Sequence, residues 1–69
     1  MNEKTLEEIE VAIGEYLIWV DKNGFSAVTS FDKDVLRNDI IKSIDNGYSI
    51  SESIEFSKDH VKYLYSEMI

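Results

Sequence analysis

The sequence contains no cysteine and no proline, and its apolar residues form no long run. Without cysteine the chain can form neither disulfides nor thiolate metal sites, and such a composition is typical of a reducing compartment. No apolar stretch approaches the roughly 20 residues that span a bilayer, and the N-terminus lacks the basic-then-apolar order of a signal peptide. We therefore expect a cytoplasmic protein without membrane contact.

Basic residues are also scarce: 7 lysines and arginines stand against 14 acids, for a net charge of −7. Direct nucleic-acid binding requires clustered lysine and arginine, and it is therefore disfavoured. Residues 1–24 carry six carboxylates against two lysines and so hold −4 of the total. An acidic surface here would attract basic proteins or simply keep the chain soluble. Its predicted members are Glu3, Glu7, Glu8, Glu10 and Glu15.

Residues that carry catalysis or bind cofactors are few. His60 is the only histidine, so a histidine pair on zinc is impossible, and the acids near it form no recognisable ligand set. Ser57 lies one turn before His60 but has no orienting acid. The three glycines stand too far apart for a phosphate loop. We therefore predict no enzyme activity, no cofactor and no metal.

Two similar segments divide the chain, Asn23-Gly24-Phe25-Ser26 and Asn46-Gly47-Tyr48-Ser49. Glycine just past an apolar repeat usually closes a helix, because it adopts a left-handed conformation without steric cost. The sequence thus predicts a single small all-α domain over residues 1–69, a three-helix bundle with helices at about 5–22, 33–45 and 50–68. The alternative is an α+β fold with a β-hairpin at about 16–30.

The first predicted helix has a regular apolar stripe, with Thr5 as a plausible N-cap. Steps of three and four residues place the stripe on one side of the helix, where it would face the core. Its members are Leu6, Ile9, Ile13, Tyr16 and Val20.

The opposite side of this helix carries Val11 and Ile18, with Gly14 between them and Trp19 alongside. A helical glycine costs about 1 kcal/mol relative to alanine and often marks the close approach of another backbone. Three alternatives remain open. The helix is covered on both sides by the other two, it pairs with another chain to form a homodimer, or residues 15–20 form a buried strand.

The second helix would be capped by Ser30 or Asp32, with its apolar face formed by Leu36, Ile40, Ile41 and Ile44 and with Val35 at the margin. The third begins with Ser49 and Glu52 at capping-box spacing. Its predicted stripe contains Ile50, Ile54, Ser57, Val61, Leu64, Tyr65 and Met68. Apolar residues at alternate positions from Tyr48 to Phe56 leave a short strand as an alternative.

Beside this stripe, Phe56, His60 and Tyr63 follow four- and three-residue spacing on an adjoining strip. Large rings there would anchor a protein partner at low entropic cost, or they would only widen the core face. Trp19 with Ile18 forms the other candidate patch.

The leading functional hypothesis is a protein-binding adaptor or inhibitor, of the kind encoded by phages and mobile elements. One alternative is an acidic nucleic-acid mimic that blocks a basic protein, whose affinity would fall steeply with added salt. Another is a small-molecule-sequestering oligomer. A third is a transcription regulator, because residues 47–52 with Ser57 and Val61 resemble the helix-turn-helix order of small regulators. The segment from Glu52 to Val61 is about three residues short for that motif and lacks its glycine.

Overall fold

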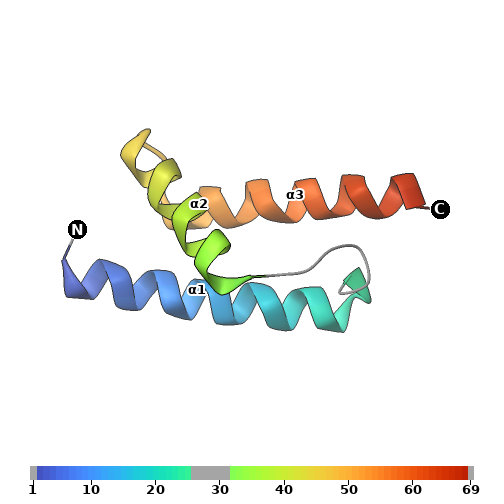
Figure 1. Ribbon diagram of the computed structural model, residues 1–69, viewed down its shortest axis with the longest axis horizontal. Helices are drawn as coiled ribbons and strands as arrows, with labels where there is room; N and C mark the ends of the chain where they lie inside the picture. Colours follow the sequence, from blue (N-terminus) through green and yellow to red (C-terminus); the bar gives the residue numbers. More distant parts are fainter. Residues whose placement is uncertain (1, 26–31, 69) are drawn as a thin grey trace.

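The computed structural model describes residues 2–25 and 32–68, which form three helices and the turns beside them. These are α1 (Glu3–Lys22), α2 (Lys33–Asp45) and α3 (Ile50–Met68), and each contacts the other two. In Figure 1, α1 and α3 run side by side in the same direction, while α2 returns obliquely across them. The predicted all-α three-helix bundle is confirmed.

Both predicted strand alternatives are wrong within the described residues. Residues 16–22 continue α1, and residues 50–56 begin α3, so both segments follow the helical period of their apolar stripes rather than an alternating one. Residues 26–30 of the alternative hairpin lie outside the described residues. The stretch from Glu52 to Val61 is uninterrupted helix, without the turn that a helix-turn-helix motif would place there.

The first helix begins earlier than its apolar stripe predicted. Asn2 and not Thr5 is the N-cap: the Asn2 side chain accepts a hydrogen bond of 2.9 Å from the Thr5 N–H. Asparagine is the stronger capping residue, which accounts for the shift. At α2 the Asp32 carboxylate accepts a 2.8 Å hydrogen bond from the Asp34 N–H, which confirms the prediction for Asp32, while Ser30 lies outside the described residues.

The predicted closing signal between α2 and α3 is confirmed in detail. Gly47 has φ +94°, and the Gly47 and Tyr48 N–H groups donate to the carbonyls of Ile44 and Ser43, both at 3.0 Å. This is a Schellman ending. The capping box follows directly, because the Glu52 N–H donates to Ser49 Oγ at 3.1 Å and the Ser49 N–H donates to Glu52 Oε1 at 3.2 Å.

The core is built on the predicted stripe of α1. Its buried members pack in two clusters, one with Ile40 of α2 and one with Val61 of α3; half-buried Leu17, Leu36 and Ile54 contact both. Leu6, the first residue of the stripe, is 39% exposed. The buried members of the stripe are Ile9, Ile13, Tyr16 and Val20.

The end of α3 departs from the prediction. Tyr65 and Met68 are 37% and 59% exposed, although both continue the apolar stripe. The reason is the length of α2: its 13 residues are too few to cover a helix of 19. Figure 1 shows α2 crossing the N-terminal half of α3 only.

The opposite side of α1 is left open by the other two helices. Val11 and Ile18 are 62% and 65% exposed, because α2 and α3 both pack on the stripe that faces the core. The alternative in which the other two helices cover both sides of α1 is therefore wrong, and so is the alternative of a strand at residues 15–20. A Cβ on Gly14 would meet no atom within 4 Å, so nothing in the described chain requires this glycine.

The single arginine of the sequence joins α1 to α2. Arg37 Nε donates to Glu10 Oε1 at 2.5 Å, and Arg37 Nη1 donates to Asp34 Oδ1 at 2.7 Å. The hydrogen bond from Arg37 lowers the pKa of the Glu10 carboxyl below its ordinary value of 4.5. This contact relieves part of the repulsion among the acids of α1.

Substitution of Ile13 by alanine should reduce the free energy of unfolding by about 2–5 kcal/mol, because it leaves a cavity beneath both partner helices. Ile18→Ala removes the same atoms from the exposed side of the same helix and should change it by less than about 0.5 kcal/mol. Urea denaturation followed by circular dichroism measures both. If both variants lower the free energy of unfolding equally, Ile13 is not more deeply buried than Ile18, against the structure.

Glu10→Gln should lower the melting temperature at pH 7, because the ion pair with Arg37 is formed only while Glu10 is charged. A carboxyl with a lowered pKa stabilises the fold above its unfolded-state pKa, and this contribution disappears as the pH falls through the folded value. The difference from wild type should therefore shrink below pH 4.5 and vanish in stronger acid. Glu15→Gln, which removes the same charge from an exposed position, controls for net charge; a pH-independent difference would contradict the assignment.

Candidate protein-binding groove

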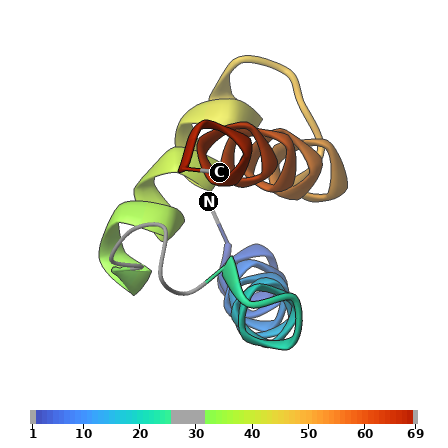
Figure 2. The ribbon, with the colours of Figure 1, turned by 90° about the vertical axis from the view of Figure 1, so that its right-hand side faces the viewer.

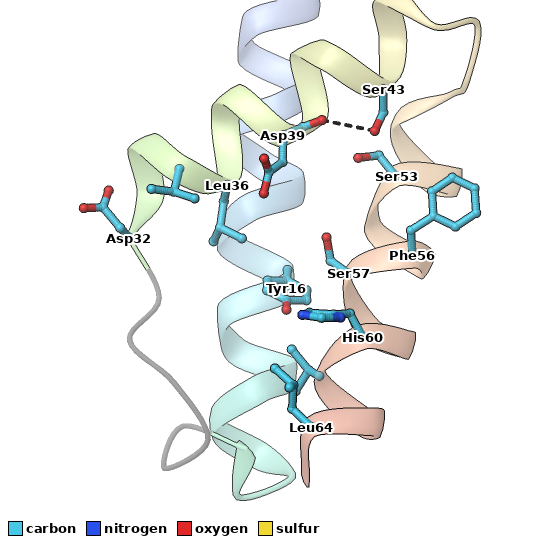
Figure 3. Close-up of a pocket in the computed structure, with 12 residues that line it drawn as sticks. Tyr16, Asp32, Leu36, Asp39, Ser43, Ser53, Phe56, Ser57, His60 and Leu64 are labelled. Carbon is cyan, nitrogen blue, oxygen red and sulfur yellow. Dashed lines mark hydrogen bonds between the residues drawn. The ribbon is translucent and has the colours of Figure 1, made fainter. Parts of the chain in front are cut away.

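An open groove of about 420 Å³ lies between α2 and α3, with α1 beneath it (Figure 3). We call it the α2–α3 groove. Its floor is Tyr16 of α1, and its walls belong to the two other helices. The lining residues of α2 and of the position before it are Asp32, Val35, Leu36, Asp39 and Ser43, and those of α3 are Ser53, Phe56, Ser57, His60, Val61 and Leu64.

The groove exists because α2 is inclined to α3. Small side chains, Ser43 and Ser53, face each other where the two helices come together, and Ser53 is only 3% exposed. Towards the N-terminus of α2 the walls separate, so that Asp32 and Leu64 stand far apart in Figure 3. The end-on view in Figure 2 shows α2 inclined to both α1 and α3. The site is therefore a wedge that widens towards Asp32.

The floor of the groove is a core residue. Tyr16 is 2% exposed, and burial raises the pKa of its hydroxyl above the ordinary value. Figure 3 shows the imidazole of His60 extending from α3 across this floor towards the Tyr16 ring, with the Ser57 hydroxyl above it. Polar groups thus line the depth of the groove.

The walls combine exposed apolar side chains with negative charge. Val35 on one side is 56% exposed and Phe56 on the other is 49% exposed. Asp32 and Asp39 both stand on the α2 side, and none of the described lining residues is a lysine or arginine. The groove therefore fits an occupant with apolar side chains and positive charge.

Beyond the groove, the apolar surface continues along one rim. The rings of Phe56 and Tyr48 meet edge to face at 5.1 Å between centroids, and Tyr48 is 45% exposed. Figure 3 shows the Phe56 ring turned outward from the wall of the groove. An occupant that covered this pair would extend past the cavity itself, as a peptide does and a small metabolite does not.

Trp19 does not lie on an open surface patch. Its ring stacks on Tyr16 at 6.0 Å and tilts against Phe25 at 5.1 Å, and Phe25 meets Tyr65 at 5.0 Å. Lys58 and Lys62 of α3 place their ammonium groups 5.2 and 5.9 Å from the Trp19 ring. Cation–π contacts of this kind cover the ring from solvent. Trp19 thus joins α1 to α3 at the end that α2 leaves uncovered.

The predicted partner-binding residues separate into different places. Phe56 and His60 line the α2–α3 groove, whereas Tyr63, 61% exposed, lies outside it. Val11, Gly14 and Ile18 lie together on the other side of the molecule. The predicted acidic residues all occupy exposed positions on α1, and among them Glu10 is paired with Arg37. They are Glu3, Glu7, Glu8, Glu10 and Glu15.

Sequence reasoning missed several residues of the groove. Asp39 reads as an ordinary solvated acid, and Tyr16 reads as core only. The sequence did carry one signal, two small residues on the core-facing side of α3. Ser53 and Ser57 stand where a closely packed helix would carry larger side chains. Small residues there indicate either that a neighbouring helix approaches closely or that a hollow is present, and the structure has both between α2 and α3.

Comparison with known proteins gives no relative: no protein-family model, no curated protein and no solved structure matches this chain. Within residues 2–25 and 32–68, no three acidic or histidine side chains gather as metal ligands. None of the three described helices is long and apolar enough to cross a membrane.

Trp19→Ala should reduce the free energy of unfolding by about 2–3 kcal/mol, because Trp19 packs inside the chain. Phe56→Ala should cost at most about 1 kcal/mol, since it removes one exposed ring pair. Thermal melts followed by circular dichroism measure both losses. If Phe56→Ala lowers the free energy of unfolding more than Trp19→Ala does, Phe56 stabilises the fold and its side chain is not available to bind a partner.

Proposed function

We propose that this protein acts by binding a segment of another protein in the α2–α3 groove. The observation that carries the proposal is an open groove that exposes apolar side chains on both walls and whose described lining residues include Asp32 and Asp39 but no lysine or arginine. Grooves between helices commonly receive the apolar face of an amphipathic helix. Two acids on one wall favour a helix that carries lysine or arginine beside its apolar face.

The exposed rings at the rim support a protein occupant over a small molecule. The groove volume of about 420 Å³ falls within the range of about 300–1,000 Å³ found for small-molecule sites. However, Phe56 and Tyr48 extend the apolar surface outside the cavity, and aromatic side chains often provide most of the binding energy at protein interfaces. A helix lying along the groove would cover these rings, with one large apolar residue inserted above Tyr16.

The proposed role is that of an adaptor or inhibitor without catalytic activity. The supporting feature is a wall chemistry suited to recognition: apolar surface, acids on one side, and His60 without an acid placed to orient it among the described lining residues. The absence of cysteine supports a cytoplasmic setting.

The immobilised wild-type chain should capture its partner from a lysate, and variants of the groove should capture less of it. Phe56→Ala should weaken binding of the captured partner at least about tenfold, while Tyr63→Ala, which removes an exposed ring from α3 outside the groove, should not. Isothermal titration calorimetry with the purified partner measures the dissociation constants.

Charge provides a second matched pair. Asp39→Asn and Asp59→Asn remove the same charge, but only Asp39 lines the groove, so only Asp39→Asn should weaken binding. If Phe56→Ala and Asp39→Asn both bind the partner as wild type does, the groove is not the site. Equal weakening by Asp59→Asn would indicate attraction by net charge alone.

A further inference from the structure

The solvent face of α1 carries a second apolar patch, on the side of the molecule opposite the groove. It consists of Val11 and Ile18, exposed by 62% and 65%, with Gly14 between them. In Figure 3, α1 passes behind the groove, so the side of α1 turned away from α2 and α3 faces the other way. One partner seated in the groove would leave this patch free.

Gly14 gives the patch its distinctive shape. It stands in the middle of a 20-residue helix, where glycine is unfavourable compared with alanine. A Cβ at this position would meet nothing within 4 Å, so no contact among the described residues excludes a side chain. Glycine flanked by two exposed aliphatic residues forms a shallow saddle, and a backbone from outside can approach it closely.

Charge indicates what kind of surface would cover the saddle. Exposed acids surround it on α1, and two lysines, Lys4 and Lys22, stand near the ends of the helix. A second copy of this chain would bring the same acids to the contact, since residues 1–24 hold six carboxylates against two lysines. The neighbouring acids are Glu3, Glu7, Glu8 and Glu15.

The size of the patch also argues against a homodimer. Stable interfaces bury about 1,200–2,000 Å² in total. Two aliphatic side chains on one helix provide little of this area, so attraction between opposite charges must supply part of the affinity. Two copies of this face, each with a net negative charge, repel each other on balance, whereas a basic partner is attracted.

We propose that the solvent face of α1 is a second docking surface, which binds a basic helix of a protein partner whose backbone crosses α1 at Gly14. Small residues of the partner rest on Gly14, its aliphatic residues contact Val11 and Ile18, and its lysines or arginines lie beside the glutamates. The protein then has two recognition surfaces on opposite sides, the arrangement that an adaptor requires.

The test uses a fluorescent 20-residue helical peptide with an alanine stripe flanked by lysines, which carries no large apolar residue to fill the α2–α3 groove above Tyr16. Its binding is followed by fluorescence anisotropy at 150 mM salt. Gly14→Ala should raise the melting temperature by about 4–8 °C, because alanine is the better helix former and has open space. The same variant should bind the peptide at least about tenfold more weakly. Weaker binding by a more stable fold cannot result from unfolding.

Neutral variants separate the two surfaces. Ile18→Gln should weaken peptide binding by a similar factor, whereas Val35→Gln makes a comparable change in the wall of the groove and should leave it unchanged. The reverse pattern would place the peptide in the groove and overturn this inference while leaving the proposed function intact. Wild-type affinity in both Gly14→Ala and Ile18→Gln would also overturn it.

Two further controls address the nature of the occupant. A peptide with the same lysines and a serine stripe should bind at least about tenfold more weakly; equal binding would mean that charge alone attracts the peptide, against the proposal. Sedimentation velocity should show the wild-type chain as a monomer. A dimer that Ile18→Gln dissociates would mean that a second copy covers this face instead.

Discussion

Burial of one stripe of α1 against α2 and α3 is the interaction on which the rest of the structure depends. Ile9 and Ile13 pack with Ile40 in one cluster, and Tyr16 and Val20 pack with Val61 in the other. A chain of 69 residues buries little apolar area, and this burial must offset the conformational entropy lost on folding. The stripe of α1 therefore packs against both α2 and α3.

The same constraint creates the binding surfaces. Because α2 is inclined to α3, Tyr16 becomes the floor of a groove, and because both helices pack on one side of α1, Val11 and Ile18 remain exposed.

Charge shapes these surfaces without determining the fold. The net charge of −7 opposes compaction, and the single arginine is placed where it joins two helices, between Glu10 of α1 and Asp34 of α2. Lys58 and Lys62 lie over Trp19 and are likewise engaged within the chain. Among the described residues, the groove and the solvent face of α1 are thus bordered mainly by uncompensated carboxylates. Apolar side chains bordered by negative charge favour a positively charged partner, because burial of apolar surface and attraction between opposite charges both stabilise the complex.

The helices and their ends could be predicted from local chemistry. The glycines after Asn23 and Asn46 and the capping box of Ser49 and Glu52 act within one turn, so they can be recognised without knowledge of the rest of the chain. The start of α1 was misplaced because Asn2 and Thr5 are both capping residues, and the apolar stripe begins only at Leu6.

The groove could not be predicted in this way. It depends on the inclination of α2 to α3, which results from packing among residues distant in sequence, so Asp39, Ser43 and Tyr16 gave no local sign that they share a site. Trp19 was predicted to face a partner, yet it packs against Phe25 and the lysines of α3.

The central claim is that the core is complete without a partner and that recognition uses only the surfaces it leaves exposed. Amide chemical-shift mapping of the isotope-labelled chain, titrated with its purified partner, tests this most directly. The account predicts large shifts for residues lining the α2–α3 groove or lying around Gly14, with the buried residues Ile9 and Val20 almost unchanged. Shifts spread through those buried residues would show that the helices rearrange on binding, and shifts confined to surface outside both sites would show that neither is used. Either result would contradict the account.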